Sequence, residues 1–247
     1  GTPLEVSWPP TQSVGSSRAV RAPLSADASA AANAAVDPPA ITTPNDTHHP
    51  IACAFLDRGI DVISDKPLTN TMDDALDLVA RTRSSGLVFG VTYTYSGHAM
   101  VRQAREMALA GELGELRQIH IEYLQDWAIG RPDQFSKGAA WRMDKTHSGE
   151  SFTTADIGTH GHHLGCFVTG RRMEKVSAEF HVCGDPKPLE DTAFFRTRHE
   201  GDVPGTMIIS QAAAGTHCGL QLRLFGTKAS LAWLQEEPEY LHFRPVN

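Results

Sequence analysis

One aspartate and two histidines share a face of a helix predicted over residues 152–168. Asp156, His160 and His163 stand at positions i, i+4 and i+7, a spacing that brings side chains to the same side of a helix. Three interpretations suit this spacing: a polar helix face with structural histidines, a zinc site with an open position, and acid–base chemistry. In the third, an imidazole with a pKa of about 6.5 takes up and returns a hydroxyl proton at neutral pH, while the carboxylate orients it.

A lysine at the end of a predicted strand is the second candidate for chemistry. Lys66 follows the short apolar strand 60–63 and directly precedes Pro67. Open α/β sheets bind their ligands at the carboxyl ends of the strands, which favours a functional lysine. Pro67 restricts the backbone at Lys66 and is compatible with a cis peptide bond. The alternative is a solvated lysine in a turn, the commoner environment of this residue.

The chain changes its pattern near residue 112. Before that point short apolar strands alternate with amphipathic helices, which predicts a parallel sheet with right-handed crossovers. The helices are expected over 47–56, from 69 or 71 to 83, and over 98–109; the strands are expected over 60–63 and 87–91. After that point apolar and polar residues alternate, as in an antiparallel sheet with one covered face, at 119–123, 176–182 and 220–224. The helix over 152–168 is expected to cover part of this second sheet or to line a cleft beside it.

Composition narrows the class of protein. The 247 residues suffice for one large domain or two modest ones, and 40% hydrophobic with 21% charged residues is typical of globular proteins. No apolar run approaches the roughly 18 residues of a membrane span, and no secretory signal is evident, so a cytoplasmic location is expected. A net charge of −7 argues against general nucleic-acid binding and favours small-molecule substrates. The four cysteines form no C-x-x-C pair and are expected to be reduced thiols.

Three ordered motifs are similar to those of a known enzyme family. Thr43-Pro44-Asn45-Asp46-Thr47-His48, then Asp65-Lys66-Pro67, then Asp156-x-Gly-x-His160 resemble the glucose-fructose oxidoreductase and inositol dehydrogenase family (Gfo/Idh/MocA) in order and spacing. The segment 225–231, FGTKASL, also resembles the G-T-K-G-S turn of that family. The resemblance extends from Ile41 to about Leu234.

The resemblance implies a fold, a cofactor and a reaction. The expected fold class is α/β: an incomplete Rossmann-type parallel sheet domain (41–112), followed by an α+β domain with an open, mostly antiparallel sheet (113–247). NAD or NADP would bind between the two domains. The expected reaction transfers a hydride between this cofactor and a carbinol or carbonyl of a sugar-like or cyclitol-like substrate. The open sheet of the second domain often forms the oligomer interface in this family, so a homo-oligomer is expected.

The resemblance also implies roles for single residues. Lys66 matches the catalytic lysine of the E-K-P motif, and Asp156 and His160 match the acid and the histidine that contact substrate hydroxyls. In that mechanism His160 or Lys66 removes the hydroxyl proton, and Asp156 holds the imidazole or the substrate. The residues expected at the cofactor are Thr43, Pro44, Asn45, His48, Asp65 and Lys66. The residues expected at the substrate are Tyr93, Trp141, Arg142 and His160, although an aromatic residue at a strand end, such as Tyr93, often serves packing alone. No metal ligand is implied.

The chain departs from the family pattern at several positions. Asp65 stands where the family usually has glutamate, and His163 stands where many members have aspartate. Residues 1–40 are rich in Ser, Ala and Pro and are expected to be irregular, apart from a short helix over Ala28–Ala35. They do not match the family, and a reading-frame error, a fragment boundary or a native extension would each account for them. Two other functions therefore stay open: a non-catalytic dinucleotide-binding regulator or inactive fragment, and a metal-dependent enzyme using Asp156, His160 and His163.

The sequence contains no G-x-G-x-x-G motif, and this predicts weak dinucleotide binding. In Rossmann domains that motif presents backbone N–H groups to the pyrophosphate at a helix N-terminus. We expect isothermal titration of the purified chain with NAD and with NADP to show no saturation at micromolar concentrations. A dissociation constant in the micromolar range for either dinucleotide would contradict this expectation.

Overall fold

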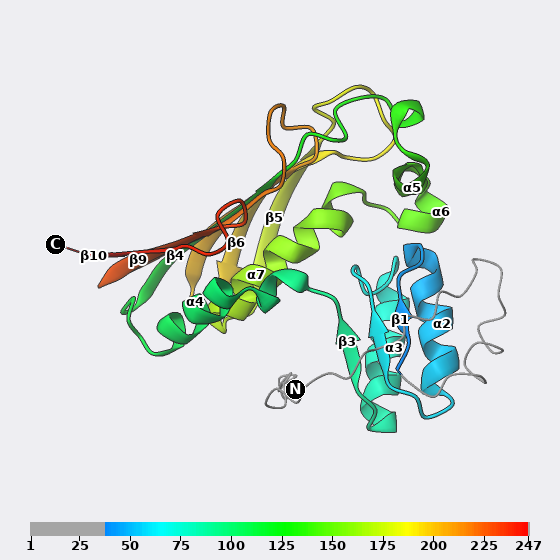
Figure 1. Cartoon of the computed structure of the whole chain (residues 1–247), viewed down its shortest axis with the longest axis horizontal. Coiled ribbons are helices and arrows are strands. Elements are labelled where there is room, and N and C mark those ends of the chain that lie inside the picture. The colour runs from blue at the N-terminus through cyan, green and yellow to red at the C-terminus, as the bar shows by residue number, and fades with distance from the viewer. Residues whose placement is uncertain (1–37, 247) are drawn as a thin grey trace.

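The computed structural model describes residues 38–246 of the chain. The helix expected over Ala28–Ala35 lies outside these residues. The described part contains a small three-stranded sheet with its helices and a larger seven-stranded sheet, shown side by side in Figure 1. Among the described residues, no helix is both long enough and apolar enough to cross a membrane.

The small sheet is parallel throughout. Its strands β1 (Ala40–Ile41), β2 (Val62–Ser64) and β3 (Phe89–Val91) lie in the order β1-β2-β3. Their register aligns Ile41 with Ser64 and Ser64 with Val91, so the three strands end at the same edge. The connections are the 3₁₀ turn η1 (Asn45–Thr47), the helix α2 (His48–Leu56) and the helix α3 (Met72–Ser85). The strand–helix alternation predicted from the sequence is thereby confirmed.

Local signals set the limits of α3. The Thr71 side chain accepts a hydrogen bond from the Asp74 backbone N–H, which caps the first turn, and Asp73 and Asp74 place negative charge there. The helix ends at Gly86, whose φ of 70° is a left-handed conformation that glycine adopts without strain. The apolar side of α3 and α2 packs on the sheet through one cluster, Ile41, Ala52, Phe55, Leu56, Val62 and Leu78.

The large sheet has the strand order β10-β9-β8-β4-β7-β6-β5. All neighbours are antiparallel except β4 and β7, which run parallel. Its strands are β4 (Leu116–Leu124), β5 (Met173–His181), β6 (Thr192–His199), β7 (Val203–Ser210), β8 (Gly219–Gly226), β9 (Ala229–Leu234) and β10 (Leu241–Pro245). This arrangement confirms the predicted fold class, a partial Rossmann-type sheet followed by an open, mostly antiparallel one.

Two helices cover one face of the large sheet and leave the other face open (Figure 1). They are α4 (Ala99–Leu109), which follows the 3₁₀ turn η2 (Thr94–Gly97), and α7 (Thr159–Thr169). The main core lies between these helices and the sheet, where Leu164, Val168 and Trp233 are fully buried. Shorter elements connect β4 to α7: η3 (Pro132–Gln134), α5 (Lys137–Ala140), η4 (Trp141–Met143) and α6 (Lys145–Ser148).

The helix predicted over 152–168 differs from its prediction at the start. A π-helical turn, η5 (Thr154–Gly158), precedes α7 and contains Asp156. Gly161 and Gly165 face the sheet, and a Cβ atom at these positions would lie 2.9 Å from Met207 Sδ and 2.7 Å from Ile121 Cδ1. The two glycines therefore allow α7 to lie close against β4 and β7, and this sets the position of the residues at its N-terminal end.

Candidate active site

Lys66 follows β2 at the carboxyl edge of the small sheet, as predicted. The Asp65 carboxylate accepts the Lys66 backbone N–H at 2.9 Å and the hydroxyl of Thr92, which follows β3. The Lys66–Pro67 peptide bond is cis. The Asp65 side chain is shorter than the glutamate that is usual at this position in the family. It hydrogen-bonds to its own loop and to the end of the neighbouring strand, and it thereby fixes the backbone from which Lys66 extends.

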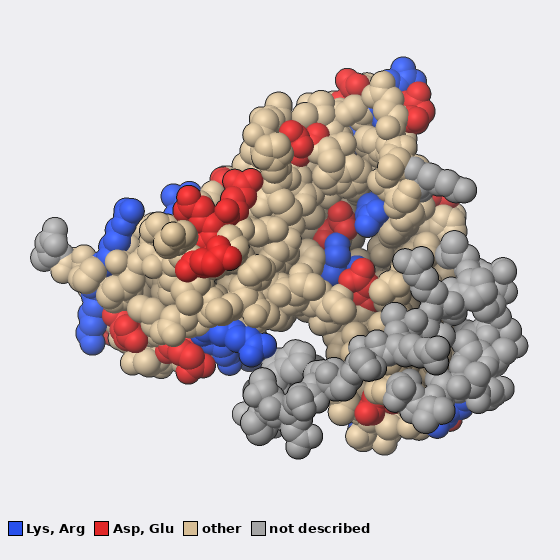
Figure 2. All heavy atoms as spheres, viewed as in Figure 1, with Lys and Arg blue, Asp and Glu red and all other residues tan. Residues whose placement is uncertain are grey.

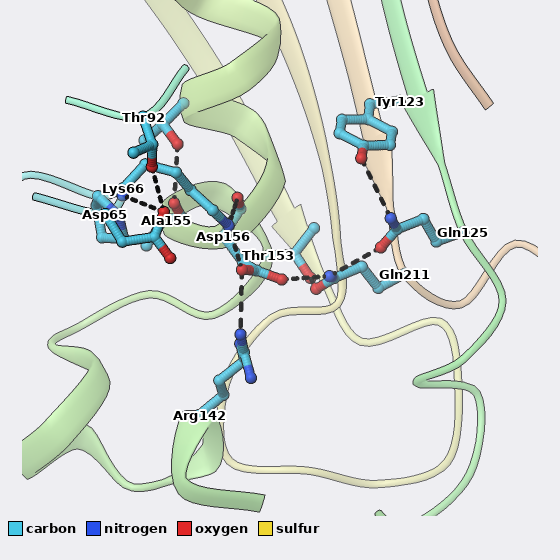
Figure 3. A network of polar contacts seen from close by, with 12 residues as sticks. Asp65, Lys66, Thr92, Tyr123, Gln125, Arg142, Thr153, Ala155, Asp156 and Gln211 are labelled. Carbon is cyan, nitrogen blue, oxygen red and sulfur yellow. Dashed lines mark hydrogen bonds and ion pairs between the residues drawn. The ribbon is translucent and has the colours of Figure 1, made fainter. Parts of the chain in front are cut away.

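The Lys66 ammonium joins the two domains. It donates to Asp156 Oδ1 at 2.6 Å and to the Asp156 backbone carbonyl at 2.7 Å, across 90 positions of sequence (Figure 3). Both side chains are only 15% exposed. Two predicted residues from different domains are thereby brought into direct contact.

The Asp156 carboxylate has two further partners. Gln211 Nε2 donates to its Oδ2 at 2.7 Å, and Arg142 Nε lies 3.5 Å from its Oδ1. Burial acts to raise the pKa of Asp156, but the charges of Lys66 and Arg142 and the hydrogen bonds outweigh burial and hold the pKa below its ordinary value. Asp156 is therefore ionised at neutral pH and faces two cations.

Gln211 is a site residue that the sequence reasoning missed. Its Oε1 accepts from Thr153 Oγ1 at 2.8 Å, and its Nε2 also donates to Gln125 Oε1 at 3.1 Å (Figure 3). Gln125 Oε1 in turn accepts from Trp127 Nε1 at 2.9 Å. Gln211 is fully buried, so these bonds fix which of its side-chain atoms faces Asp156. Its place directly after β7 was the only signal in the sequence.

His160 lies one turn after Asp156 and points into a group of tyrosines. Its ring centroid lies 4.9, 5.9 and 6.4 Å from those of Tyr95, Tyr93 and Tyr123. Its Nδ1 is buried and finds no hydrogen-bond partner among the described residues. Burial, reinforced by the charge of Lys66, lowers the pKa of His160 to about 4, so the ring is neutral at pH 7. The ring of His160 is thus neutral and lies among tyrosine rings, in a largely apolar environment.

His163 and Tyr93 stack on each other. Their ring centroids are 4.2 Å apart and their planes differ by 8°. Burial, with the nearby His162, lowers the pKa of His163 to about 4. Tyr93 therefore packs against α7 through both His160 and His163.

A cavity of about 220 Å³ opens beside the ion pair. Figure 2 shows basic and acidic side chains meeting in the hollow between the two domains. The domain that contains the three-stranded sheet contributes Thr42, Thr43, Pro44, Asn45, Asp65 and Lys66 to its lining. The larger domain contributes Gly138, Trp141, Arg142, Ser148, Ser151, Phe152, Ala155 and Asp156. The Arg142 guanidinium lies over the Trp141 ring at 4.7 Å, so these two side chains form one wall.

Comparison with known families identifies both parts of the chain. Residues 101–232 match the GFO/IDH/MocA C-terminal domain. Residues 10–93 match an oxidoreductase family with an NAD-binding Rossmann fold, so the match includes residues 10–40, which were expected not to match the family. The chain belongs to the Gfo/Idh/MocA family of oxidoreductases. The predicted family and the predicted nicotinamide-dinucleotide-binding domain are confirmed.

Individual members of the family are similar over most of this chain. An oxidoreductase of Bacillus subtilis is 32% identical over 210 residues, which cover 82% of this chain and 52% of that protein. Levoglucosan dehydrogenase of Pseudarthrobacter phenanthrenivorans is 28% identical over 150 residues, or 61% of this chain and 37% of that one. The crystal structure of an inositol dehydrogenase homolog with NAD⁺ from Azotobacter vinelandii is 31% identical with a TM-score of 0.82, covering 88% of this chain and 57% of that one. The chain thus spans about half the length of several such relatives.

The structure of this Gfo/Idh/MocA protein separates the predicted site residues into two groups. The residues that line the cavity are Thr43, Pro44, Asn45, Asp65, Lys66, Trp141, Arg142 and Asp156. His48, Tyr93 and His160 do not line it. His48 is fully buried, and its two ring nitrogens lie 2.8 Å from the Thr43 carbonyl and 2.9 Å from the Pro67 carbonyl. It therefore ties together the two loops that carry Thr43 and Lys66. The roles assigned to all these residues stay predictions.

The zinc interpretation of Asp156, His160 and His163 is not supported by the geometry. Among the described residues, the group of metal-ligand atoms within 4.8 Å of one another is His49, Cys53 and Asp77. Asp156 instead accepts from the Lys66 ammonium, and His163 is stacked on Tyr93.

The buried state of His160 predicts that acid destabilises the fold. The pKa of His160 is about 4 in the folded chain, against about 6.5 in an unfolded one, so between these values the unfolded chain binds the additional proton. The stability contributed by the neutral ring is present above pH 6.5 and is lost as the pH falls towards 4. At pH 5 the loss is on the order of 2 kcal/mol.

Urea unfolding at pH 7, 6 and 5 measures this effect. We expect His160→Gln to lose part of the decline seen in the wild-type chain, whereas substitution of the half-exposed His181 by Gln leaves the decline unchanged. An unaltered decline in His160→Gln would show that another group is responsible.

Proposed function

We propose that the cavity beside Lys66 is the hydride-transfer site of an NAD(P)-dependent oxidoreductase acting on a sugar-like or cyclitol-like carbinol or carbonyl. The observation that carries this proposal is the Lys66–Asp156 ion pair, which lies against the cavity at the carboxyl edge of a parallel sheet. A hydride transfer between an alcohol and a nicotinamide requires a group that exchanges the hydroxyl proton. It also requires a site that binds both ligands, such as the end of a parallel strand.

The relatives support a polyhydroxylated substrate. The inositol dehydrogenase homolog of Azotobacter vinelandii, 31% identical, has been crystallised with NADH and myo-inositol. Levoglucosan dehydrogenase, at 28% identity, and the 1,5-anhydro-D-fructose reductase of Ensifer adhaerens, at 26%, are named for carbohydrate derivatives. The cavity is suited to such compounds because its carboxylates and cations offer both acceptors and donors to hydroxyl groups.

The described residues fit the nicotinamide end of the cofactor. Thr43, Pro44 and Asn45 follow β1 and line the cavity, and Asn45 is held buried at 6% exposure. When bound, the dinucleotide supplies the hydride acceptor or donor. The position of Thr43 is fixed independently, because its backbone carbonyl is bonded to the ring of His48.

The geometry favours Lys66 over His160 as the group that exchanges the substrate proton. Lys66 lines the cavity, whereas His160 does not and has a pKa of about 4, which makes it a poor proton acceptor at neutral pH. In the direction of reduction, Lys66 Nζ donates a proton to the carbonyl oxygen as the hydride reaches the carbon. In the direction of oxidation, the ammonium first releases a proton to solvent, and the amine then takes the hydroxyl proton as the hydride leaves the carbon. Asp156 holds Nζ in place and balances the charge of the ammonium.

Replacement of Lys66 tests the proposed role. We expect Lys66→Met to lower kcat for NAD(P)-linked oxidation of myo-inositol or a related polyol by about 10²-fold or more, the contribution typical of a positioned acid or base. The assay follows NAD(P)H absorbance at millimolar dinucleotide. Lys145→Met is the matched control, because Lys145 is half-exposed, pairs with Glu150 and does not line the cavity.

The same assay separates the alternatives. Wild-type chain that binds NAD(P) but turns over no polyol would favour a dinucleotide-binding regulator, and chain that does neither would favour an inactive fragment. Equal kcat in Lys66→Met and Lys145→Met would remove Lys66 from the mechanism.

We also propose that the open face of the large sheet forms a homo-oligomer interface. This face presents Phe194 on β6, Ile208 on β7 and Phe225 on β8 among polar side chains such as His120 and Arg223. Apolar side chains on an uncovered sheet face are protected from water when a second copy packs on them.

Light scattering after size exclusion tests this interface. We expect an oligomer for the wild-type chain and a shift to monomer for the double variant Phe194→Glu and Phe225→Glu. Substitution of the exposed Leu76 on α3 by Glu should leave the mass unchanged.

A further inference from the structure

A thiol, an imidazole and a carboxylate converge between α2 and α3, outside the cavity. His49 and Cys53 lie one turn apart on α2 and face Asp77 on α3. Cys53 Sγ is 3.5 Å from His49 Nε2 and 3.8 Å from Asp77 Oδ2, and His49 Nε2 is 2.8 Å from Asp77 Oδ2. All three residues are partly buried. These are three different ligand types that zinc accepts.

Two of the three distances match those of a tetrahedral metal site. Typical zinc bonds of about 2.3 Å to sulfur and about 2.1 Å to nitrogen or oxygen, at tetrahedral angles, separate sulfur from the other two atoms by about 3.6 Å. The two sulfur distances at this site, 3.5 and 3.8 Å, match that value. The same geometry separates nitrogen from oxygen by about 3.4 Å, so the hydrogen bond between His49 and Asp77 would open by about 0.6 Å.

The surroundings of the cluster resemble the outer shell of a metal site. Asp74 Oδ1 lies 3.5 Å from His49 Nδ1, the ring nitrogen that points away from Cys53. Arg81 Nε donates to Asp77 Oδ2 at 2.7 Å. In metalloproteins a ligating imidazole usually donates its other N–H to a carboxylate, and a ligating carboxylate is itself hydrogen-bonded. Arg81 provides the hydrogen bond to the carboxylate, and Asp74 lies within ion-pair distance of the imidazole. Without a metal the same groups form an ion-pair network around Asp77.

We propose that His49 Nε2, Cys53 Sγ and Asp77 Oδ2 bind one Zn²⁺ ion, with water as the fourth ligand. Binding converts the Cys53 thiol to a thiolate and releases its proton to solvent. The thiolate and the Asp77 carboxylate then neutralise the two positive charges of the ion. None of the three ligands lines the cavity beside Lys66, so this site is separate from the proposed hydride-transfer site.

The position of the site gives the ion a structural role. α2 begins at His48, whose ring holds the loops of Thr43 and Lys66 together, and His49 is the next residue. An ion on His49 and Asp77 links the first turn of α2 to α3. Zinc would therefore stabilise the start of α2 and, through His48, the loop that lines the cavity.

Cobalt provides a spectroscopic test on the reduced, metal-free chain. We expect one equivalent of Co²⁺ to produce a thiolate-to-cobalt charge-transfer band in the near ultraviolet, and equimolar Zn²⁺ to abolish it. The band should disappear in Cys53→Ser and persist in Cys183→Ser, because Cys183 is exposed and lies outside the cluster. Asp74→Asn, which removes the carboxylate from His49 Nδ1, should weaken Zn²⁺ binding by about 10-fold or more.

The outcomes that overturn the proposal are equally specific. A band that survives in Cys53→Ser, or the lack of any band in the wild-type chain, would refute it. If Cys53→Ser fails to fold by circular dichroism, alkylation of the wild-type chain replaces it. Zn²⁺ should then slow iodoacetamide labelling of Cys53 at least 10-fold relative to Cys183 in the same molecules, as read from the two peptides by mass spectrometry. An unchanged rate at Cys53 would exclude thiolate ligation.

Discussion

The charge pair between Lys66 and Asp156 is the contact on which the rest of the site depends. Burying a lysine and an aspartate at 15% exposure removes most of their hydration, and this cost is offset only if each group keeps good partners. Asp65 holds the backbone of Lys66, and Gln211 occupies the second oxygen of Asp156. Because the partners come from both sheets, the two domains must be correctly docked before the pair is satisfied. Because the cavity lies beside this pair, it is lined by residues of both domains.

The position of Asp156 follows from the way α7 packs. Gly161 and Gly165 let the helix lie close to Ile121 and Met207, and the π-helical turn 154–158 precedes this contact. On a regular helix Asp156 and His160 would lie one above the other. Here Asp156 reaches across to Lys66, whereas the ring of His160 is enclosed by tyrosines. The i, i+4 spacing suggested an aspartate and a histidine that act together. The fold instead places the charged Asp156 at the cavity and encloses the neutral ring of His160 among tyrosines.

Sequence patterns predicted the elements and the strand-end residues, because both depend on local information. The alternation of strands and helices, the start of a helix at residue 69 or 71 and the placement of Lys66 after a strand are properties of short segments. The Gln211 contact, the parallel pairing of β4 with β7 and the approach of Asp77 to Cys53 are different. Each joins residues that are between 24 and 86 positions apart through tertiary packing, and no periodicity within one segment reports which distant segment will lie beside it.

The register of the small sheet explains why residues from separate motifs meet. Ile41, Ser64 and Val91 are aligned across β1, β2 and β3, and Thr43, Lys66 and Tyr93 each follow two residues later. Equivalent positions beyond parallel strands lie along one edge, which is where such sheets bind ligands. Tyr93 is diverted from this edge by stacking on His163, while Thr43 and Lys66 keep it and line the cavity. One wall of the cavity is therefore set by the strand register of one domain, and Asp156 and Arg142 of the other domain close it.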